Sequence, residues 1–430
     1  MDISRQKTAI VLGGTVPHID LIKELKKRAY HTVLIDYFTD PPAAVYADVH
    51  YRESAMDLEA VLAIAKKYDT KLVLSSCLDQ QMNVAMKVAE ELGLSHPFSF
   101  ATAEKVTNKR MMKKIMMEYH IPTAKYYVVD RDFDLSLLDL KAPVIIKPDA
   151  SSGSAGVTKL SELDQKKLKE SLNKACSFGL TGKAIVEEFI DGCEMSVHAI
   201  ADNGHARILF GTSRVCDADE NTNLLLYNVY LPKLNAALQK KLEDVADQIL
   251  AAFELKGSVP LFMQVMIKDE EVYVLEFSPR LGGGISSMVA KDYTGIDLIS
   301  FSIDSYLGIR REYDETAVLG RYVCCLPIYA KKGIYEKLKG VDQLIDQNML
   351  HAVIKLKEAG EEADDSKPSR SIVAKLVFDA SSIEECYSKM RRFSDLIDVE
   401  DPEGNSIRLP VKSVSFEEFS AKLTMMLQVD

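Results

Sequence analysis

Two segments of the chain, about 130 residues apart, carry residue types that suit nucleotide binding. The first, residues 144–157, is an apolar run that ends in Lys147 and continues into a loop of small residues that contains Ser152, Gly153, Ser154 and Gly156. Gly and Ser let a backbone approach an anion closely, so successive N–H groups can point at phosphate oxygens. The Walker pattern is absent, so the segment predicts a flexible flap over phosphates, with a surface lysine and a hairpin turn as the alternative.

The second segment, residues 272–284, is an apolar strand that delivers a carboxylate, Glu276, and then a cation, Arg280. Glu276 and Ser278 alternate with Phe277 and therefore share one face of the strand, and Gln264 lies across a predicted hairpin. One carboxylate with amide and hydroxyl oxygens suits Mg²⁺, which also takes phosphate and water oxygens. Arg280 can stabilise charge that develops during phosphoryl transfer.

A third segment, residues 184–194, is an apolar strand that runs into the acidic pair Glu187 and Glu188. Such a strand can offer backbone groups to a purine edge, and Glu194, seven residues beyond Glu187, can reach a ribose. An acidic turn on a surface hairpin is the alternative. Arg214 is a weaker candidate for the same pocket, with an ordinary charge at a strand end as its alternative.

Composition narrows the class of protein. The 430 residues predict two or three domains, and 47% hydrophobic with 27% charged residues is an ordinary soluble balance. A formal net charge of -11 argues against a general nucleic-acid binder, and the pairs Lys113–Lys114 and Lys166–Lys167 are interpreted as solvated helix faces. No apolar run reaches the roughly 18 residues of a membrane span. Seven scattered cysteines, and an N-terminus without a signal-peptide profile, predict a cytoplasmic protein with reduced thiols.

The elements that must position these residues follow from the hydrophobic pattern. Strand-like and helix-like segments alternate in the first hundred residues, which predicts parallel βαβ units: strands at 8–13, 32–36 and 71–75, helices at 19–29 and 57–68. A helix is expected from about 107 to 119, a hairpin at 264–276 with residues 268–271 as its turn, and a strand-rich region from about 318.

Gly13 and Gly14 follow the first strand and imitate the start of a dinucleotide-binding motif. The full G-x-G-x-x-G pattern is missing, which makes a nicotinamide-dependent oxidoreductase a poor interpretation. Two interpretations remain open: a tight turn in an open α/β sheet, or a pocket for one end of a substrate.

In the order and spacing of these motifs the chain resembles the ATP-grasp superfamily, in its biotin carboxylase and carbamoyl-phosphate synthetase-like branch, which also holds amino-acid ligases. The motifs that carry the resemblance span residues 8–310. It implies an α/β and α+β multidomain fold, with an open parallel α/β domain at 1–105, an ATP-grasp domain of two α+β subdomains at 106–310, and a strand-rich, lid-like domain at 311–430. The glycine-loop subdomain is expected at about 123–186.

The resemblance also implies roles for individual residues. Lys109 and Lys147 match the two phosphate-binding lysines, Glu194 matches the ribose carboxylate, and Gln264 and Glu276 match metal-ligand positions. Glu187, Glu188 and Ile190 match the adenine-binding hinge. Ser278 departs from the family pattern Glu-x-Asn-x-Arg, which puts the number of bound metal ions in doubt.

The reaction that the resemblance implies starts when a carboxylate attacks the γ-phosphate of ATP to form an acyl phosphate, which an amine then displaces. Mg²⁺ is the expected metal, and Mn²⁺ can substitute for it. Arg280 is expected to hold the acyl-phosphate oxygens, and Gly283 and Gly284 to line the acceptor pocket with backbone N–H groups. Small-molecule carboxylate and amine substrates are the expected partners, and oligomeric state stays open, with a homodimer as one option. A bicarbonate-activating enzyme and a catalytically degenerate ATP-binding protein remain the alternatives.

Overall fold

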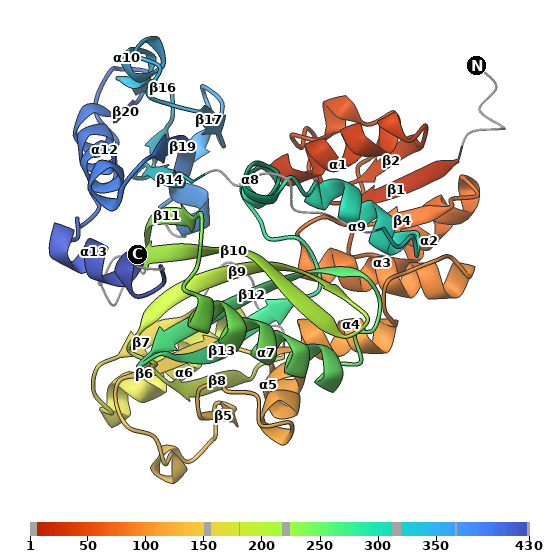
Figure 1. Ribbon diagram of the computed structural model, residues 1–430, viewed down its shortest axis with the longest axis horizontal. Helices are drawn as coiled ribbons and strands as arrows, with labels where there is room; N and C mark the ends of the chain where they lie inside the picture. Colours follow the sequence, from red (N-terminus) through yellow and green to blue (C-terminus); the bar gives the residue numbers. More distant parts are fainter. Residues whose placement is uncertain are drawn as a thin grey trace.

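The computed structural model describes residues 7–149, 156–179, 181–216, 224–311, 320–365 and 368–427. Figure 1 shows an N-terminal lobe in red and orange, a central body in yellow and green, and a C-terminal lobe in blue. The multidomain α/β and α+β fold that the sequence predicts is confirmed.

The N-terminal lobe is an open parallel sheet in the order β3-β2-β1-β4. Its strands are β1 (Thr8–Leu12), β2 (His31–Ile35), β3 (Val49–Tyr51) and β4 (Leu72–Leu74), and its helices are α1 (Val16–Lys27), α2 (Leu58–Lys67) and α3 (Asp79–Leu92). A later helix, α9 (Leu298–Tyr306), is fastened to this lobe because Arg28 Nη1 donates a hydrogen bond of 2.6 Å to Asp304 Oδ1.

Two short helices, α4 (Phe100–Thr107) and α5 (Lys109–Glu118), lead from this lobe into the central body. Asn108 separates them, and its side chain accepts hydrogen bonds from the first free backbone N–H groups of α5. A four-stranded antiparallel sheet follows, and helix α6 (Gln165–Phe178) packs on it. The strand order is β5-β8-β6-β7, with β5 (Tyr126–Val129), β6 (Val144–Pro148), β7 (Thr158–Leu160) and β8 (Ala184–Glu188). This subdomain has its own small hydrophobic cluster, separate from the main core.

An eight-stranded antiparallel sheet joins the central body to the C-terminal lobe, in the order β13-β12-β9-β10-β11-β14-β19-β17. Its strands are β9 (Cys193–Asp202), β10 (His205–Cys216), β11 (Leu225–Leu231), β12 (Val259–Lys268), β13 (Glu271–Ser278), β14 (Tyr322–Tyr329), β17 (Ala352–Lys355) and β19 (Ile372–Ala380). Helices α7 (Ala236–Ala252) and α8 (Ser286–Thr294) complete the central body. Because β11 pairs with β14, the sheet continues across the boundary expected at 310, and that boundary stays a prediction.

The C-terminal lobe adds short elements around this sheet. Two small strand pairs join β15 (Gly333–Ile334) to β18 (Glu362–Ala363) and β16 (Lys337–Lys339) to β20 (Asp398–Glu400). The helices are α10 (Val341–Asp346), α11 (Pro368–Ser371), α12 (Ile383–Leu396) and α13 (Phe416–Thr424). Among the helices described, none combines the length and the apolar character needed to cross a bilayer.

The hairpin that carries Gln264 and Glu276 is confirmed in detail. Lys268 pairs with Glu271, and the two residues between them, Asp269 and Glu270, have φ values of 50° and 63°. Two central residues with positive φ form the tight turn whose twist matches that of the strands beside it. Gln264 lies directly opposite Glu276 in the ladder, so the two side chains share one face of the sheet.

Candidate active site

Four charged side chains from three parts of the chain meet beside the end of β13. The Arg280 guanidinium binds the Asp79 carboxylate through two contacts, Nε to Oδ1 at 2.8 Å and Nη2 to Oδ2 at 3.0 Å. Asp79 opens α3 in the N-terminal lobe, so this bidentate pair joins two domains. Lys109, the first residue of α5, places its Nζ 3.3 Å from Glu276 Oε2. We call these four residues the cleft cluster.

The cleft cluster is crowded by protein yet reachable by solvent. The side chains of Asp79 and Glu276 are 42% and 40% exposed, and that of Lys109 is 28% exposed. Burial opposes the ionisation of both carboxyl groups, yet Arg280 holds the pKa of Asp79, and Lys109 the pKa of Glu276, below its usual range. The cluster therefore presents ionised groups that solvent, and so a small charged ligand, can reach.

The oxygens beside this cluster fit a hard divalent cation. Glu276 supplies a carboxylate, and Gln264, opposite it, donates its amide N–H to Glu194 Oε1 at 3.4 Å, which leaves its own amide oxygen available. The Ser278 hydroxyl is buried and has no hydrogen-bond partner of ordinary geometry among the described residues, although after Arg280 it contributes to the lowered pKa of Asp79. No group of three His, Cys, Asp or Glu that could hold a metal occurs in the described ranges. Mg²⁺, which takes few carboxylates and completes its shell with phosphate and water, fits this donor set.

A second cluster of charges, which we call the buried cluster, lies between α5 and the four-stranded sheet. Glu187 Oε2 is 2.8 Å from Lys113 Nζ, and Glu187 Oε1 accepts from Lys147 Nζ. The Glu187 side chain is 5% exposed. Burial works against its ionisation, but Lys147 and Lys113 hold its pKa at about 2. Both oxygens of Glu187 are thus engaged by lysines, and its expected place at the adenine edge stays a prediction.

Glu194 and Arg214, expected separately, form an ion pair on neighbouring strands. Arg214 Nε lies 2.7 Å from Glu194 Oε1, the same oxygen that Gln264 contacts. Glu194 raises the pKa of Arg214 above its ordinary value, although burial works in the opposite direction. Gln264 therefore connects this pair to the metal-type oxygens around Glu276.

The remaining expected residues are placed as follows. Ser152, Gly153 and Ser154 lie outside the described residues. Gly156 has a φ of 77°, and a Cβ there would lie 2.9 Å from atoms of Phe178 and Pro148, so the backbone requires glycine. Glu188 and Ile190 are half-buried at the end of β8 and just beyond it, and Gly283 and Gly284 are exposed after Arg280.

One expectation about surface charge is wrong. Lys113 was expected on a solvated helix face, but it is 1% exposed and bonds both Glu187 and Thr123, the latter at 2.8 Å. The signal was present in the spacing, because Lys109 and Lys113 are four residues apart and so lie on one face of α5. Asp79 was missed altogether. Its position just beyond β4, at the carboxyl edge of a parallel sheet, is where ligands of such sheets bind.

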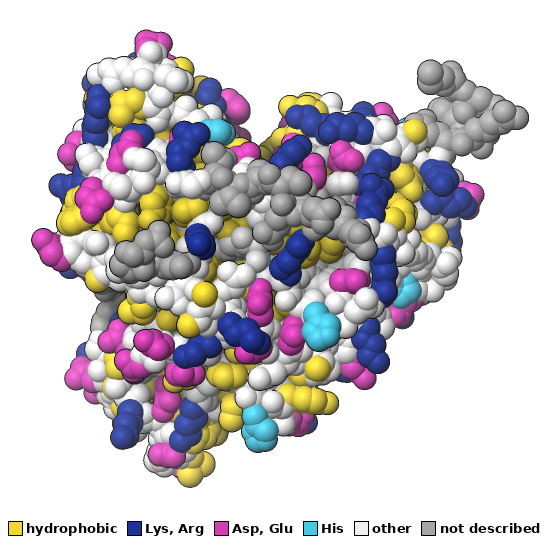
Figure 2. All heavy atoms as spheres, viewed as in Figure 1, with side chains coloured by type: hydrophobic (Ala, Val, Ile, Leu, Met, Phe, Trp, Pro, Cys, Tyr) yellow, Lys and Arg dark blue, Asp and Glu magenta, His cyan; other side chains and the backbone are white. Residues whose placement is uncertain are grey.

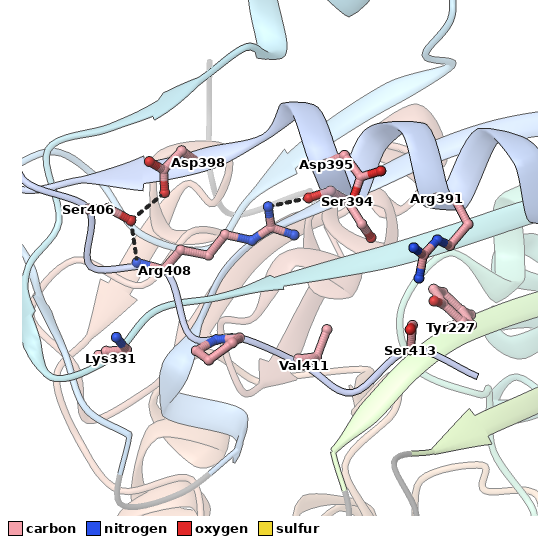
Figure 3. Close-up of a pocket in the computed structure, with 11 residues that line it drawn as sticks. Tyr227, Lys331, Arg391, Ser394, Asp395, Asp398, Ser406, Arg408, Val411 and Ser413 are labelled. Carbon is pink, nitrogen blue, oxygen red and sulfur yellow. Dashed lines mark hydrogen bonds between the residues drawn. The ribbon is translucent and has the colours of Figure 1, made fainter. Parts of the chain in front are cut away.

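A cavity of about 420 Å³ in the C-terminal lobe includes none of these residues. Figure 3 shows it between α12, the segment around Arg408 and Tyr227 of β11. The Arg408 guanidinium donates to the backbone oxygens of Ser394 and Ile397 at the end of α12, and Ser406 donates to Asp398 at 2.6 Å. These polar groups hold the helix end and the following strand together.

Comparison with known proteins supports a nucleotide-binding site at these residues. The protein-family model that describes the ATP-grasp domain matches residues 104–284, a range that contains Lys109, Glu276 and Arg280. Phosphoribosylamine–glycine ligase of Leptospira interrogans is 33% identical over 201 residues, which cover 43% of this chain and 47% of that enzyme, so the chain spans about half of this relative.

D-alanine–D-alanine ligase of Cupriavidus necator is 31% identical over 123 residues, which cover 28% of this chain and 36% of that enzyme. Among solved structures, L-amino acid ligase from Bacillus licheniformis superposes with a TM-score of 0.78 over 92% of this chain and 99% of its own, at 18% identity. The chain therefore contains an ATP-grasp domain at residues 104–284, and it shares its overall fold with this solved ligase structure.

Proposed function

We propose that this protein is an ATP-dependent ligase that joins a carboxylate to an amine through an acyl phosphate and releases ADP and phosphate. The observation that carries the proposal is the convergence of Lys109, Glu276, Arg280 and Asp79 at one solvent-accessible place beside the end of β13. Two of the relatives described above are ligases by name, which supports the same class of reaction.

The two lysines would hold the phosphates of ATP. Lys109 and Glu276 are already adjacent, so a phosphate oxygen at Lys109 and a cation at Glu276 would complete an alternating line of charges. Lys147 is 14% exposed and shares the Glu187 carboxylate with Lys113. Glu187 holds the Lys147 ammonium group in position, and because it carries one negative charge for two lysines, one positive charge is left for a phosphate. Glu188, Ile190 and Glu194 would contact the nucleoside, and Arg214 would orient Glu194.

Gln264, Glu276 and Ser278 would hold Mg²⁺, which neutralises charge on the phosphate oxygens when it is bound. Because serine is shorter than the asparagine of the family pattern, we expect a water molecule to bridge the Ser278 hydroxyl to the metal. Arg280 would bind the oxygens of the transferred phosphoryl group, and the bidentate contact to Asp79 fixes the plane of its guanidinium before substrate arrives.

The reaction then follows from these positions. A carboxylate oxygen of the first substrate attacks the γ-phosphorus, the bond to the β-phosphate oxygen breaks, and ADP leaves. The nitrogen of the second substrate attacks the acyl carbon and loses a proton, the bond to phosphate breaks, and the new C–N bond remains. Positioning and charge stabilisation supply most of the catalysis in such a mechanism.

The test is ADP and phosphate release with Mg-ATP across a panel of amino acids, dipeptides, small carboxylic acids and bicarbonate. Glu276→Ala removes the proposed metal-binding carboxylate of the cleft cluster, and Glu271→Ala, on the same strand but solvent-exposed, is the matched control. Release that needs both a carboxylate and an amine, and that only Glu276→Ala abolishes, supports the ligase. Release with bicarbonate alone favours a carboxyphosphate-forming enzyme, and ATP binding without turnover favours a degenerate binder.

A further inference from the structure

A second cavity, of about 270 Å³, opens between the N-terminal and C-terminal lobes, next to the candidate active site. Gly284, four residues beyond Arg280, forms part of its wall. The opposing walls come from the loop after β2 and from the sheet of the C-terminal lobe: Phe38, Pro41, Pro42, Ile354, Leu356 and Lys375. Figure 2 shows the surface notched between these two lobes.

The polar groups of the N-terminal wall are already engaged. Asp36 Oδ2 accepts from Gly14 N at 2.7 Å, and its Oδ1 accepts from Phe38 N at 2.9 Å. Thr15 Oγ1 lies 2.9 Å from His18 Nδ1. At the start of α1, Pro17 has no N–H and the His18 N–H donates to Thr15 O at 2.9 Å. The side-chain oxygens of this wall are therefore already bonded, and its prolines and Phe38 present carbon to a ligand.

Lys375 is the exception in this cavity. Its side chain is half-buried on β19 and forms no ion pair or hydrogen bond with the other described residues. The cavity thus combines apolar walls with one available cation. A phosphate monoester carries nearly two charges and is normally met by several charged donors, whereas Lys375 is the one lysine or arginine among the described residues that line this cavity.

The mouth of the cavity is apolar as well. Phe38, which lines the cavity, is 56% exposed, and its ring lies tilted by 33° against that of the neighbouring Tyr37, with centroids 4.0 Å apart. Leu356 is 40% exposed on the facing lobe. Exposed apolar groups that gather on both sides of an opening mark a binding site more often than chance exposure.

We propose that this cavity binds the side chain of an acceptor amino acid with a branched aliphatic or aromatic group, and that Lys375 pairs with its carboxylate. This inference rests on the proposed ligase function and names the amine substrate of the same site. The volume, slightly below the roughly 300–1,000 Å³ of drug-sized sites, suits an amino acid rather than a nucleotide-sized acceptor.

The kinetic test compares L-phenylalanine, L-leucine, L-alanine, O-phospho-L-serine and L-phenylalaninamide as acceptors in the ADP-release assay. Leu356→Asp is expected to raise KM for phenylalanine and leucine about tenfold or more with little change in kcat, and to leave alanine nearly unaffected. Lys375→Met is expected to raise KM for phenylalanine but not for phenylalaninamide, which lacks the carboxylate. Ile345→Ala, an exposed apolar position on α10 away from the cavity, is the control and should change neither value.

A preference for alanine or phosphoserine, or unchanged KM in Leu356→Asp and Lys375→Met, overturns the inference. If circular dichroism shows that Leu356→Asp is unfolded, Leu356→Ala is used in its place. A calorimetric titration of the protein in Mg-ADP with phenylalanine distinguishes failure of the cavity assignment from failure of the proposed ligase function. Binding that Leu356→Asp abolishes supports the cavity even if no acceptor gives turnover, in which case only the ligase proposal fails. Absence of phenylalanine binding overturns the cavity assignment.

Discussion

The cleft cluster and the buried cluster contain the same kinds of groups, carboxylates held by Lys and Arg, but they differ in exposure. In the buried cluster Glu187 is 5% exposed and both its oxygens are taken by lysines. In the cleft cluster the carboxylates are about two-fifths exposed, and Glu276 has a single cationic contact. The carboxylate of the buried cluster is therefore satisfied without a ligand, whereas the carboxylates of the cleft cluster are still open to one.

The difference matters because solvent decides what an ion pair contributes. Removing one partner of a buried pair leaves a charge that neither water nor protein compensates, so the penalty falls on folding. Removing one partner of an exposed pair costs little stability, because water replaces it. We therefore expect variants of the buried cluster to lose stability and variants of the cleft cluster to lose activity.

The largest effect is expected for Arg280→Ala. Loss of the donors that meet the transferred phosphoryl group should lower kcat for ADP release by about 10²–10³-fold. The midpoint of thermal unfolding should move little, because the abandoned Asp79 carboxylate is 42% exposed and becomes hydrated. Steady-state assays and a thermal melt measure both quantities. A large drop in the melting midpoint with near-normal kcat would contradict the expectation that variants of the cleft cluster lose activity rather than stability.

The second effect concerns Glu187→Gln, which removes the shared carboxylate and leaves Lys113 and Lys147 without their counter-ion. We expect a loss of about 3–5 kcal/mol in the free energy of unfolding, since the pair is broken in a buried place. Chemical denaturation measures this free energy. The control is Glu118→Gln, which breaks the exposed pair of Glu118 with Lys114 on α5, the helix that carries Lys113. A loss as small as that of the control would show that water reaches the buried cluster.

The third expectation is a pH dependence of stability that reports on a histidine near Arg280. Burial, and then the Arg280 charge, lower the pKa of His198 to about 3. The unfolded chain binds a proton at this histidine below about pH 6.5 and the folded chain does not, so its contribution to stability is lost as pH falls from about 6.5 toward 3.

His198→Phe keeps an aromatic ring stacked on Phe210 and removes the titrating group. Between pH 6 and 4 the slope of the unfolding free energy against pH should decrease by about 1.4 kcal/mol per pH unit. Denaturation curves at several pH values, with wild type as the reference, measure the slope. An unchanged slope would contradict the assigned pKa.

The smallest effect is expected for Ser278→Asn, which restores the asparagine usual in the family. We expect a lower half-saturating Mg²⁺ concentration, because a longer amide oxygen reaches farther than the buried serine hydroxyl, and a kcat change of only a few-fold. Titration of ADP release with Mg²⁺ measures it. A rise in the half-saturating concentration would mean that Ser278 does not face the metal.

Much of the local structure could be predicted from the sequence, because it depends on neighbours along the chain. The parallel units of the first lobe and the hairpin that sets Gln264 opposite Glu276 follow from alternation of apolar residues and short turns. The same local rules failed for Lys113. A lysine in a polar helix segment has the same pattern whether it faces water or a buried carboxylate 74 residues later, as Glu187 does here.

By itself the sequence predicted the class of chemistry, from a lysine followed by a loop of small residues, a carboxylate at the end of a strand and an arginine at family spacing. Only the tertiary structure decided which charges meet, because pairing of Asp79 with Arg280, 201 residues apart, requires two domains to pack face to face. It also decided that one sheet runs from the ATP-grasp body into the C-terminal lobe, and that apolar residues from both ends of the chain enclose a cavity. Such contacts depend on burial and on long-range packing, which no local pattern of residues encodes.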